Sequence, residues 1–220
     1  LRTGGPRRPG NTMGVNVPTK EALVTGGAGY VGAVLVPKLL EQGYRVKVLD
    51  LYMYGRHVLD AVADHPNLEQ ITGDIRDRAL LKRVIPGCDA VIHLACISND
   101  PSFELDPDLG KSINYDAFPA LVDVSKDSGV ERFVFSSTAA AYGIPDTARV
   151  DETPRLAPIN PYGHSKVMTE QVLSDIGAAT GLSFAILRYF NVAGADPAGR
   201  TGQATPNATH LIKVACEVAT

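Results

Sequence analysis

The feature of this sequence that most constrains the fold is a glycine triplet near the amino end. A short apolar run, residues 22–24, leads into Gly26, Gly29 and Gly32, and an apolar pattern of helical period follows. The first glycine permits a sharp turn, the second lets the backbone approach a ligand, and the third lets the helix pack on the strand. The free N–H groups and positive dipole end of such a helix suit a pyrophosphate. The stretch therefore predicts a strand that turns directly into a helix beneath a bound anion, although glycine-rich turns also join ordinary strands and helices.

An acidic residue at the end of the next strand-like run supports this interpretation. Residues 44–49 form the run, and Asp50 follows it, eighteen residues after Gly32. A carboxylate at this distance is placed to accept hydrogen bonds from an adenosine ribose, and it repels a 2′-phosphate. The alternative is a solvated residue at a strand end. Together with the glycine triplet, Asp50 predicts dinucleotide binding, with NAD favoured over NADP.

Strand and helix patterns alternate along the rest of the chain. Strands are expected near 68–72, 90–95, 131–135 and 182–187, and helices near 57–64, 77–85, 110–128 and 161–180. The alternation predicts an α/β fold with a doubly wound parallel sheet and helices on both faces. Ligands of such sheets bind beyond the carboxyl ends of the strands. Pro37 and Pro119 fall inside expected helices, so either the helices kink there or their boundaries lie elsewhere.

Composition and charge exclude several classes of partner. With 45% hydrophobic residues, 20% charged residues and a formal net charge of −3, nothing points to nucleic acid or to an anionic membrane. The apolar runs are far shorter than a membrane span. Residues 1–11 lack the apolar segment of a secretory signal, and residues 1–18 are expected to form a flexible tail. We therefore expect a cytoplasmic protein.

The cysteines and histidines show no metal-ligand spacing. The odd number of cysteines, three, indicates free thiols in a reducing compartment. The five histidines are scattered, and His93 in an apolar strand is expected to be a core residue. The residues concerned are Cys88, Cys96, Cys216, His57, His65, His93, His164 and His210. No metal site is predicted.

Two groups of residues later in the chain could carry chemistry. Ser136, Ser137 and Thr138 follow the expected fifth strand, where hydroxyls commonly cap a helix or form a turn. Tyr162 and Lys166 are four residues apart in an expected helix, so they share one face, one turn apart. Such a pair is also frequent on helix surfaces. The order of these groups after the glycine triplet and the acidic strand end favours a catalytic site.

This order of motifs resembles the extended short-chain dehydrogenase/reductase family, which has the Rossmann fold. Within that family, residues 20–215 are similar to the nucleotide-sugar epimerases and most of all to the UDP-glucose 4-epimerases. The most specific stretch is 187–197 (LRYFNVAGADP), with Gly199, Arg200 and 209–212 beyond it. The resemblance implies an NAD-dependent epimerase whose substrate is a nucleotide sugar, with a UDP-sugar expected.

The resemblance also implies roles for individual residues. Tyr162 and Lys166 form the catalytic pair, and Thr138 assists them. The implied cofactor contacts are Gly26, Gly29, Tyr30, Val31, Gly32, Asp50, Leu51, Asp74, Ile75, Leu94, Ala95, Asn114, Ser136, Tyr162, Lys166 and Phe190. The implied substrate contacts are Thr138, Asn191, His210 and Leu211. Family members often form homodimers, here through the helices expected at 110–128 and 161–180.

The residue types suit this chemistry. A free tyrosine has a pKa of about 10 and is a poor base at neutral pH. A neighbouring ammonium and an oxidised nicotinamide both favour the phenolate, which lowers that pKa towards the working range. Tyr162 can then take a proton from a sugar hydroxyl, while Lys166 holds the nicotinamide ribose and Thr138 hydrogen-bonds the reacting oxygen.

A departure from the epimerase pattern leaves alternatives open. After the fourth strand the chain reads CISNDP (96–101), where epimerases carry small residues and a lysine near the phosphates. Ala139 and Ala140 stand where the 4,6-dehydratases of this family carry Asp-Glu, so dehydration is disfavoured. The alternatives are another NAD-dependent sugar-nucleotide dehydrogenase, decarboxylase or reductase, and a non-catalytic NAD-binding module.

Length is a second departure from the epimerase pattern. Family members continue for about another hundred residues, as a smaller domain that closes over the sugar nucleotide. Residues 19–190 are expected to form the NAD-binding domain, and 191–220 the start of a truncated substrate-binding region. The apolar run at 211–218 is expected to be poorly covered.

Overall fold

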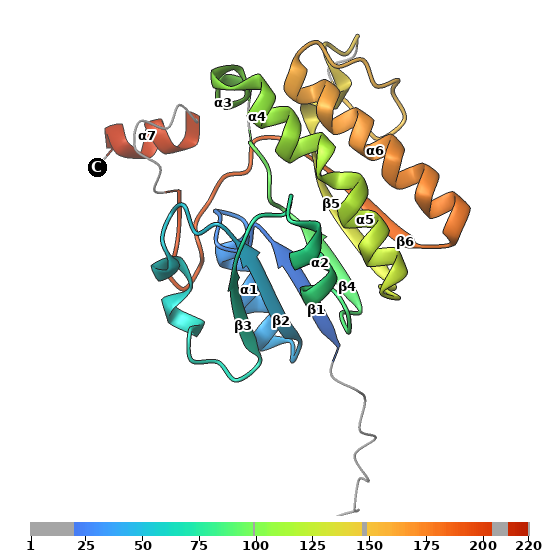
Figure 1. Cartoon of the computed structure of the whole chain (residues 1–220). Coiled ribbons are helices and arrows are strands. Elements are labelled where there is room, and N and C mark those ends of the chain that lie inside the picture. Colours follow the sequence, from blue (N-terminus) through green and yellow to red (C-terminus); the bar gives the residue numbers. More distant parts are fainter. Residues whose placement is uncertain (1–19, 99, 147–148, 204–210, 220) are drawn as a thin grey trace, which may run out of the picture.

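A six-stranded parallel sheet forms the centre of the protein, in a computed structural model that describes residues 20–98, 100–146, 149–203 and 211–219 (Figure 1). The strand order is β3-β2-β1-β4-β5-β6. The strands are β1 (Glu21–Thr25), β2 (Arg45–Asp50), β3 (Leu68–Thr72), β4 (Ala90–His93), β5 (Arg132–Thr138) and β6 (Ser183–Tyr189). The order reverses between β1 and β4, so the predicted doubly wound parallel sheet is confirmed. The expected tail at 1–18 lies outside the described residues.

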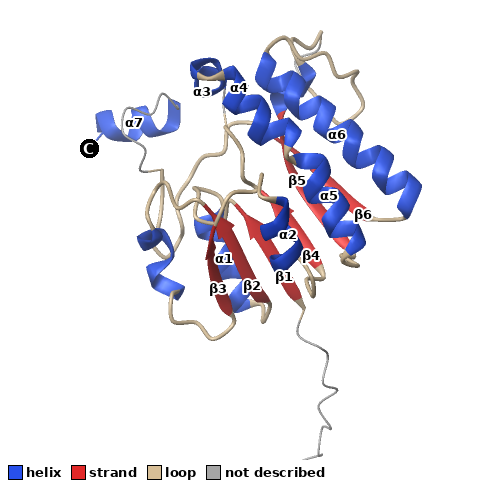
Figure 2. Ribbon diagram, in the orientation of Figure 1, coloured by secondary structure: helices blue, strands red, loops and turns tan. Residues whose placement is uncertain are grey.

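Helices cover both faces of the sheet (Figure 2). They are α1 (Gly32–Glu41), the 3₁₀ helix η1 (Arg56–Val62), α2 (Arg78–Val84), α3 (Asp100–Leu105), α4 (Pro107–Lys111), the π-helical turn η2 (Ser112–Asp116), α5 (Phe118–Asp127), the 3₁₀ turn η3 (Ala139–Tyr142), α6 (Pro161–Thr180) and α7 (Leu211–Ala219). On one face α2, α5 and α6 bury Leu81, Leu121 and Leu173 against the sheet. On the other face α1 and η1 bury Val36 and Leu59. Full burial of each such side chain contributes about 1.5–3 kcal/mol.

The single helix expected at 110–128 is wrong. The structure divides this segment into the end of α4, the turn η2 and α5, and Pro119 occupies the second position of α5. Near the start of a helix a proline removes no intrahelical hydrogen bond, so the boundary lies elsewhere and no kink is needed. Pro37 does lie inside α1. The stretch expected as a helix at 57–64 is the 3₁₀ helix η1.

Strands β5 and β6 extend further than the apolar pattern indicates. β5 ends at Thr138, so the hydroxyl cluster forms its last three positions and does not follow it. The cluster pairs with Leu187, Arg188 and Tyr189 of β6. Backbone pairing does not depend on apolar side chains, which is why the pattern ends before the strand does. The hydroxyls therefore lie on the sheet itself.

The chain after β6 returns across the carboxyl ends of the strands towards α1 (Figure 1). Tyr30 of the glycine turn donates a hydrogen bond to the carbonyl of Gly194 at 2.5 Å. Arg200 forms an ion pair with Glu41 at 3.5 Å. Helix α7 has no buried residue, as expected for the apolar run at 211–218. None of the helices in the described part of the chain has the length and apolarity that crossing a bilayer requires.

Candidate active site

The glycine triplet forms the turn between β1 and α1. Gly26 has a φ of +73°, and a Cβ there would lie 2.5 Å from the backbone N of Ala95. At Gly29 a Cβ would meet the carbonyl of Gly26 at 3.3 Å, and the turn is otherwise open on that side. At Gly32 a Cβ would lie 2.4 Å from the carbonyl of Gly27. Gly32 therefore lets the first turn of α1 lie close against the turn that follows β1.

The amino end of α1 fits a negatively charged group. Val31 precedes the helix without a side-chain cap, and the first turn of the helix carries no acidic residue. The backbone N–H groups of Ala33 and Val34 donate to the carbonyls of Gly29 and Val31, at 2.8 and 3.2 Å, so those of Val31 and Gly32, with the positive dipole end of the helix, are the ones that can bind an anion. Together with the open side of Gly29, this end of the helix fits the pyrophosphate of a dinucleotide.

Asp50 is held beside this turn. It is the last residue of β2, and its carboxylate accepts hydrogen bonds from the backbone N of Ala28 at 2.9 Å and of Tyr52 at 2.7 Å. Each carboxylate oxygen can accept more than one hydrogen bond, so a ribose hydroxyl can still donate to Asp50. Leu51 is exposed next to it. The structure thus brings the two parts of the predicted dinucleotide signature together.

The two residues expected at the adenine differ in character. Asp74 pairs with Arg76, with 2.6 Å between Oδ2 and Nη2, and the hydrogen bond from Arg76 holds the pKa of Asp74 below its ordinary value. Ile75 is buried in the core that α2 and α5 cover. The side chain of Asp74 is partly exposed and can contact a ligand, whereas the buried Ile75 can contact it only through its backbone.

The loop after β4 lies against the glycine turn. Leu94 donates its backbone N–H to the carbonyl of Thr25 at 2.9 Å, and Ala95 follows at the close approach to the turn. Asn114, buried in η2, accepts a hydrogen bond from the backbone N of Ile97 at 2.8 Å and donates to its carbonyl at 3.0 Å. π-helical turns are rare and frequently occur at functional sites. The side chain of Asn114 therefore holds the loop that borders the candidate cofactor site.

His93, at the end of β4, is a buried core residue as predicted. Its Nδ1 lies 2.7 Å from the hydroxyl oxygen of Thr25, and its ring stacks on Phe135 with 5.9 Å between centroids. Burial, with a smaller contribution from the charge of Lys166, lowers the pKa of His93 to about 3. The ring is therefore neutral at physiological pH.

The first turns of α6 present Tyr162 and Lys166 to the end of β5. Asn160 caps the helix by accepting a backbone hydrogen bond of 2.7 Å, which defines where the helix begins. Tyr162 is 8% exposed and Lys166 is 2% exposed. The Lys166 ammonium donates to the carbonyl of Ser136 at 2.9 Å and lies 4.9 Å from the ring centroid of Phe135. The Tyr–Lys face is thus turned towards the sheet and does not lie on the helix surface.

Lys166 carries its charge in an apolar setting. Its Nζ lies 5.9 Å from the ring centroid of Tyr162, and within the described residues no carboxylate forms an ion pair with it. The carbonyl of Ser136 takes one of the three ammonium donors, which leaves others for a ligand. Thr138 accepts a hydrogen bond from the backbone N of Ala140 at 3.1 Å, so its own O–H can still donate. A cation close to a phenol favours the phenolate, so this group of side chains can support proton transfer.

The described residues that were expected to contribute from beyond β6 are exposed. Phe190 is 65% exposed, and Asn191 and Leu211 are exposed as well. His210 lies outside the described residues. The described chain thus brings the candidate cofactor residues close to Lys166 and the end of β5, whereas Asn191 and Leu211 face solvent.

Sequence reasoning missed a buried polar residue behind the Tyr–Lys face. Glu170, one turn after Lys166 and two turns after Tyr162, is buried and is bound by Arg188 of β6. Its spacing of four residues from Lys166 was a usable signal, because that spacing continues one helix face. Arg188 offers no comparable signal, because its position opposite Ser137 follows from strand pairing.

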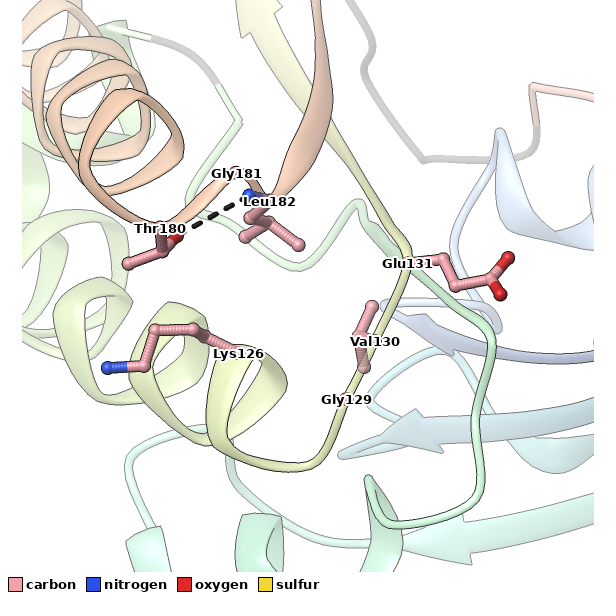
Figure 3. Close-up of a pocket in the computed structure, with 7 residues that line it drawn as sticks. All are labelled: Lys126, Gly129, Val130, Glu131, Thr180, Gly181 and Leu182. Atoms are coloured by element: carbon pink, nitrogen blue, oxygen red, sulfur yellow. Dashed lines mark hydrogen bonds between the residues drawn. The ribbon is translucent and has the colours of Figure 1, made fainter.

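A pocket of about 170 Å³ lies elsewhere on the protein (Figure 3). It is lined by Lys126, Gly129, Val130, Glu131, Thr180, Gly181 and Leu182. These residues end α5 and α6 and precede β5 and β6, so the pocket lies at the amino ends of the strands. Ligands of doubly wound sheets bind at the opposite edge, where the Tyr–Lys face and the glycine turn lie. This pocket is therefore not the candidate site.

Comparison with known proteins agrees with this geometry. The profile of the NAD dependent epimerase/dehydratase family matches residues 22–218. The chain belongs to this family. Its membership confirms the resemblance found in the sequence, and the family description confirms NAD as the cofactor that the glycine triplet and Asp50 predict.

Two curated relatives within the epimerase/dehydratase family are named UDP-glucose 4-epimerase. The protein from Azospirillum brasilense is 46% identical over 198 residues, which cover 89% of this chain and 56% of the relative. The protein from Streptococcus mutans is 41% identical over 201 residues, which cover 90% of this chain and 59% of the relative. The chain thus spans somewhat more than half the length of these relatives.

Solved structures confirm the fold. The UDP-glucose 4-epimerase from Brucella ovis in complex with NAD has a TM-score of 0.81 at 33% identity, and the match covers 90% of this chain and 60% of that one. The UDP-Glc/GlcNAc 4-epimerase from Campylobacter jejuni has a TM-score of 0.79 at 38% identity, with coverage of 91% and 62%.

Proposed function

We propose that the protein catalyses the NAD-dependent epimerisation of a nucleotide sugar, in the manner of a UDP-glucose 4-epimerase. The observation that carries the proposal is the buried Tyr162–Lys166 face beside Thr138, at the same edge of the sheet as the glycine turn. The relatives named UDP-glucose 4-epimerase, at 46% and 41% identity, support the substrate class. A UDP-sugar is accordingly the proposed substrate.

The residues around the glycine turn fit the cofactor. The open side of Gly29 and the uncapped end of α1 suit the pyrophosphate, and Asp50 suits the hydroxyls of the adenosine ribose. The remaining ammonium donors of Lys166 suit the nicotinamide ribose. When bound, NAD supplies an acceptor that takes a hydride from a sugar carbon and returns it to the opposite face.

The chain's own side chains handle the proton in this proposal. Tyr162 takes the proton of a sugar hydroxyl when that carbon is oxidised, and it returns the proton when the carbon is reduced again. The charge of Lys166 stabilises the phenolate, and the O–H of Thr138 donates to the reacting oxygen. Ala139 and Ala140 cannot move a proton, so the water elimination of a dehydratase is not proposed, although a dTDP-glucose 4,6-dehydratase from Streptomyces venezuelae is similar in fold, with a TM-score of 0.72.

The remaining sequence predictions belong to the same proposal. Asn191, His210 and Leu211 contribute to the sugar-nucleotide side, and Phe190 to the cofactor side. The NAD-binding domain covers 19–190, and the substrate-binding region starts after it. The protein acts in the cytoplasm as a homodimer that pairs through α5 and α6. The exposure of Phe190 and Leu211 leaves both side chains accessible for the contacts proposed for them.

Incubation of the purified chain with NAD and either UDP-galactose or UDP-glucose tests the proposal. We expect interconversion of the two sugars, resolved by chromatography, without a net change in NADH absorbance, because the hydride that leaves the substrate returns to it. Tyr162→Phe should abolish conversion while NAD binding persists. Tyr44→Phe, at the opposite edge of the sheet, is the matched control and should leave conversion unchanged.

Other outcomes would identify the alternatives. Accumulation or consumption of NADH would indicate a dehydrogenase, a decarboxylase or a reductase. NAD binding by the wild-type chain without conversion of any UDP-sugar would indicate a non-catalytic NAD-binding module. Either result contradicts the epimerase.

A further inference from the structure

An ion pair with a buried carboxylate lies one turn along α6 from Lys166, on the same face of the helix. Arg188 of β6 binds the carboxylate of Glu170, with Nε 3.1 Å from both oxygens and Nη2 2.7 Å from Oε2. Glu170 is 3% exposed, and the side chain of Arg188 is 19% exposed. A forked guanidinium–carboxylate pair constrains direction as well as distance, which a single ammonium contact does not.

The ion pair joins the elements that carry the candidate site. The hydroxyl of Ser137 donates a short hydrogen bond to Oε1 of Glu170, which connects β5 to α6. Arg188 donates from Nη1 to the hydroxyl of Tyr142 at 3.1 Å, which connects β6 to η3. Four elements therefore meet at one carboxylate–guanidinium pair.

The spacing along α6 couples this network to the catalytic face. Tyr162, Lys166 and Glu170 follow one another at intervals of four, so they lie one turn apart on one side of the helix. Successive turns also contact successive residues of β5, because Lys166 binds the carbonyl of Ser136 and Glu170 binds the hydroxyl of Ser137. A rotation of α6 about its axis would break both contacts and displace the phenol of Tyr162.

Stability alone explains the network poorly. The cost of desolvating two ions roughly offsets their attraction, and apolar replacement of a buried ion pair is often neutral for stability. The same face of the sheet already has a core in which Phe133 and Leu173 are fully buried. What the ion pair adds to this packing is a directional constraint.

We propose that Glu170 and Arg188 are positioning residues that set the rotation of α6 and thereby the approach of Tyr162 and Lys166 to the end of β5. The inference rests on the proposed function, because it gives the network a purpose in that reaction. In the described part of the chain, the charged side chains that face this network are those of Lys166, Glu170 and Arg188, while His93 of β4 stays neutral through burial.

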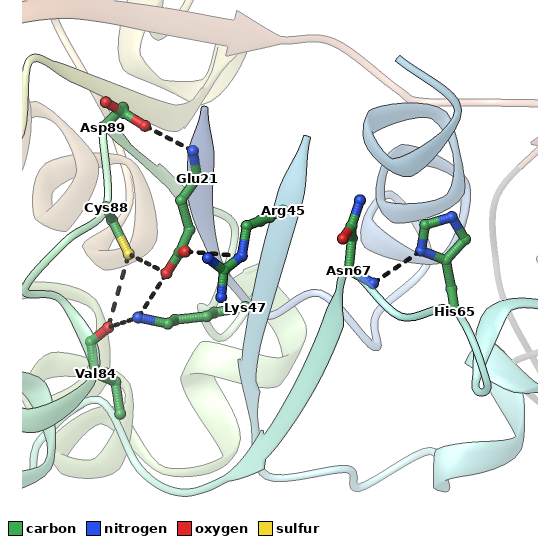
Figure 4. A network of polar contacts seen from close by, with 8 residues as sticks. All are labelled: Glu21, Arg45, Lys47, His65, Asn67, Val84, Cys88 and Asp89. Carbon is green, nitrogen blue, oxygen red and sulfur yellow. Dashed lines mark hydrogen bonds and ion pairs between the residues drawn. The ribbon is translucent and has the colours of Figure 1, made fainter. Parts of the chain in front are cut away.

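The double variant E170M/R188M removes the network without leaving an unpaired buried charge. The matched control is E21M/K47M, which removes a 2.7 Å ion pair at the amino edge of the sheet whose side chains are 13% and 17% exposed (Figure 4). Four quantities are compared: the thermal unfolding midpoint, the kcat for the UDP-sugar, its KM, and the ultraviolet absorbance of the Tyr162 phenolate with NAD bound. The phenolate signal is obtained by subtracting the spectrum of the same protein with Tyr162→Phe.

We expect the two double variants to change the unfolding midpoint by similar amounts. Only E170M/R188M should lower kcat, by between about tenfold and a hundredfold with little change in KM, as a displaced catalytic group does. It should also reduce the phenolate signal. Arg188→Lys should lose less kcat and less phenolate signal than the double variant, because lysine keeps the positive charge but not the forked geometry of the guanidinium.

Equal kcat, KM and phenolate signal in E170M/R188M and the control would overturn the proposal and leave the ion pair with a purely structural role. If the wild-type chain converts no UDP-sugar, the proposed function fails, and the phenolate signal still decides whether the network positions Tyr162. If E170M/R188M does not fold, Ser137→Ala and Tyr142→Phe each remove one contact of the network and leave the ion pair in place. An unchanged phenolate signal in both of these variants would likewise overturn the proposal.

Discussion

The amino and carboxyl edges of the sheet differ in how their charged side chains are paired. At the amino edge, Glu21 pairs with Lys47 at 2.7 Å and with Arg45 at 3.3 Å (Figure 4). Its backbone N–H donates to the carboxylate of Asp89 at 2.6 Å. At the carboxyl edge, Lys166 is buried without an ion pair among the described residues, and α1 begins without an acidic residue. Charges at the first edge thus pair with one another, whereas at the second edge Asp74 pairs with Arg76 and Lys166 is left for a ligand.

Titratable groups follow the same division. At the amino edge, burial lowers the pKa of Lys47, but its hydrogen bond to Glu21 and the negative groups around it outweigh burial and raise the pKa. Burial also raises the pKa of the Cys88 thiol to about 11, so this cysteine stays protonated and unreactive at neutral pH. At the carboxyl edge, His93 is held neutral beneath Lys166. The titratable groups at the amino edge are thus held in unreactive states. At the carboxyl edge, the ammonium group of Lys166 can still bind a ligand.

The largest expected effect comes from removing a lysine at each edge. Lys166→Met should lower kcat by about 10²–10⁴-fold, since it removes the cation beside the proposed base. It should leave the free energy of unfolding unchanged or higher, because an unpaired buried charge is costly. Lys47→Met should leave kcat unchanged and lower the free energy of unfolding by about 1–3 kcal/mol, because the largely buried carboxylate of Glu21 then keeps only its longer ion pair with the exposed Arg45. Steady-state kinetics and urea unfolding of both variants check this, and a loss of activity in both would erase the contrast.

Two glycines with positive φ give the next effect. Gly26→Ala should lower the free energy of unfolding by more than about 3 kcal/mol and abolish NAD binding, because its Cβ would lie 2.5 Å from the backbone of Ala95. Gly43→Ala, at a φ of +83° with nothing within 4 Å of the added atom, should cost about 1 kcal/mol and leave NAD binding intact. Calorimetric titration with NAD and urea unfolding measure both. Equal losses in the two variants would show that backbone strain, and not the close approach, limits Gly26.

The acid limb of the stability curve gives a smaller effect. His93 has a pKa of about 3 in the folded state against an ordinary 6.5. Between these values the unfolded chain binds a proton that the folded chain cannot, so stability is full above pH 6.5 and is lost as the pH falls, by up to about 1.4 kcal/mol per pH unit. His93→Asn should reduce the slope of unfolding free energy against pH by the contribution of one proton, as measured by urea unfolding at several pH values. The exposed His57→Asn is the control, and the idea fails if both variants keep the wild-type slope.

The smallest expected effect is at the exposed rim of the amino edge. Lys20 and Glu131 form an ion pair at 3.3 Å, with side chains 57% and 68% exposed. Glu131→Gln should change the free energy of unfolding by less than about 0.5 kcal/mol, because solvent screens such pairs, and it should not change kcat. Thermal unfolding and steady-state kinetics provide the measurement. A clear loss of activity here would mean that the amino edge communicates with the proposed site.

Much of the fold could be predicted from local patterns. The glycine triplet, Asp50 and the alternation of apolar runs led to the parallel sheet and to the edge that carries the candidate site, and α6 occupies the span expected for it. The segment 110–128 was predicted as one helix because the apolar period continues through η2, and an inserted π turn leaves no mark in that period. The hydroxyl cluster was placed beyond β5 because backbone pairing, and not apolar side chains, extends the strand to Thr138.

The sequence by itself determined the turn at Gly26, the position of Asp50 at a strand end and the shared face of Tyr162 and Lys166. Each of these features depends on residues that are close together along the chain. Only the tertiary structure decided that Glu170 meets Arg188, that Ser137 joins them and that Lys166 is left without a carboxylate partner among the described residues. Those contacts depend on the register of β5 with β6 and on the rotation of α6 against the sheet, and no local period of the sequence encodes either.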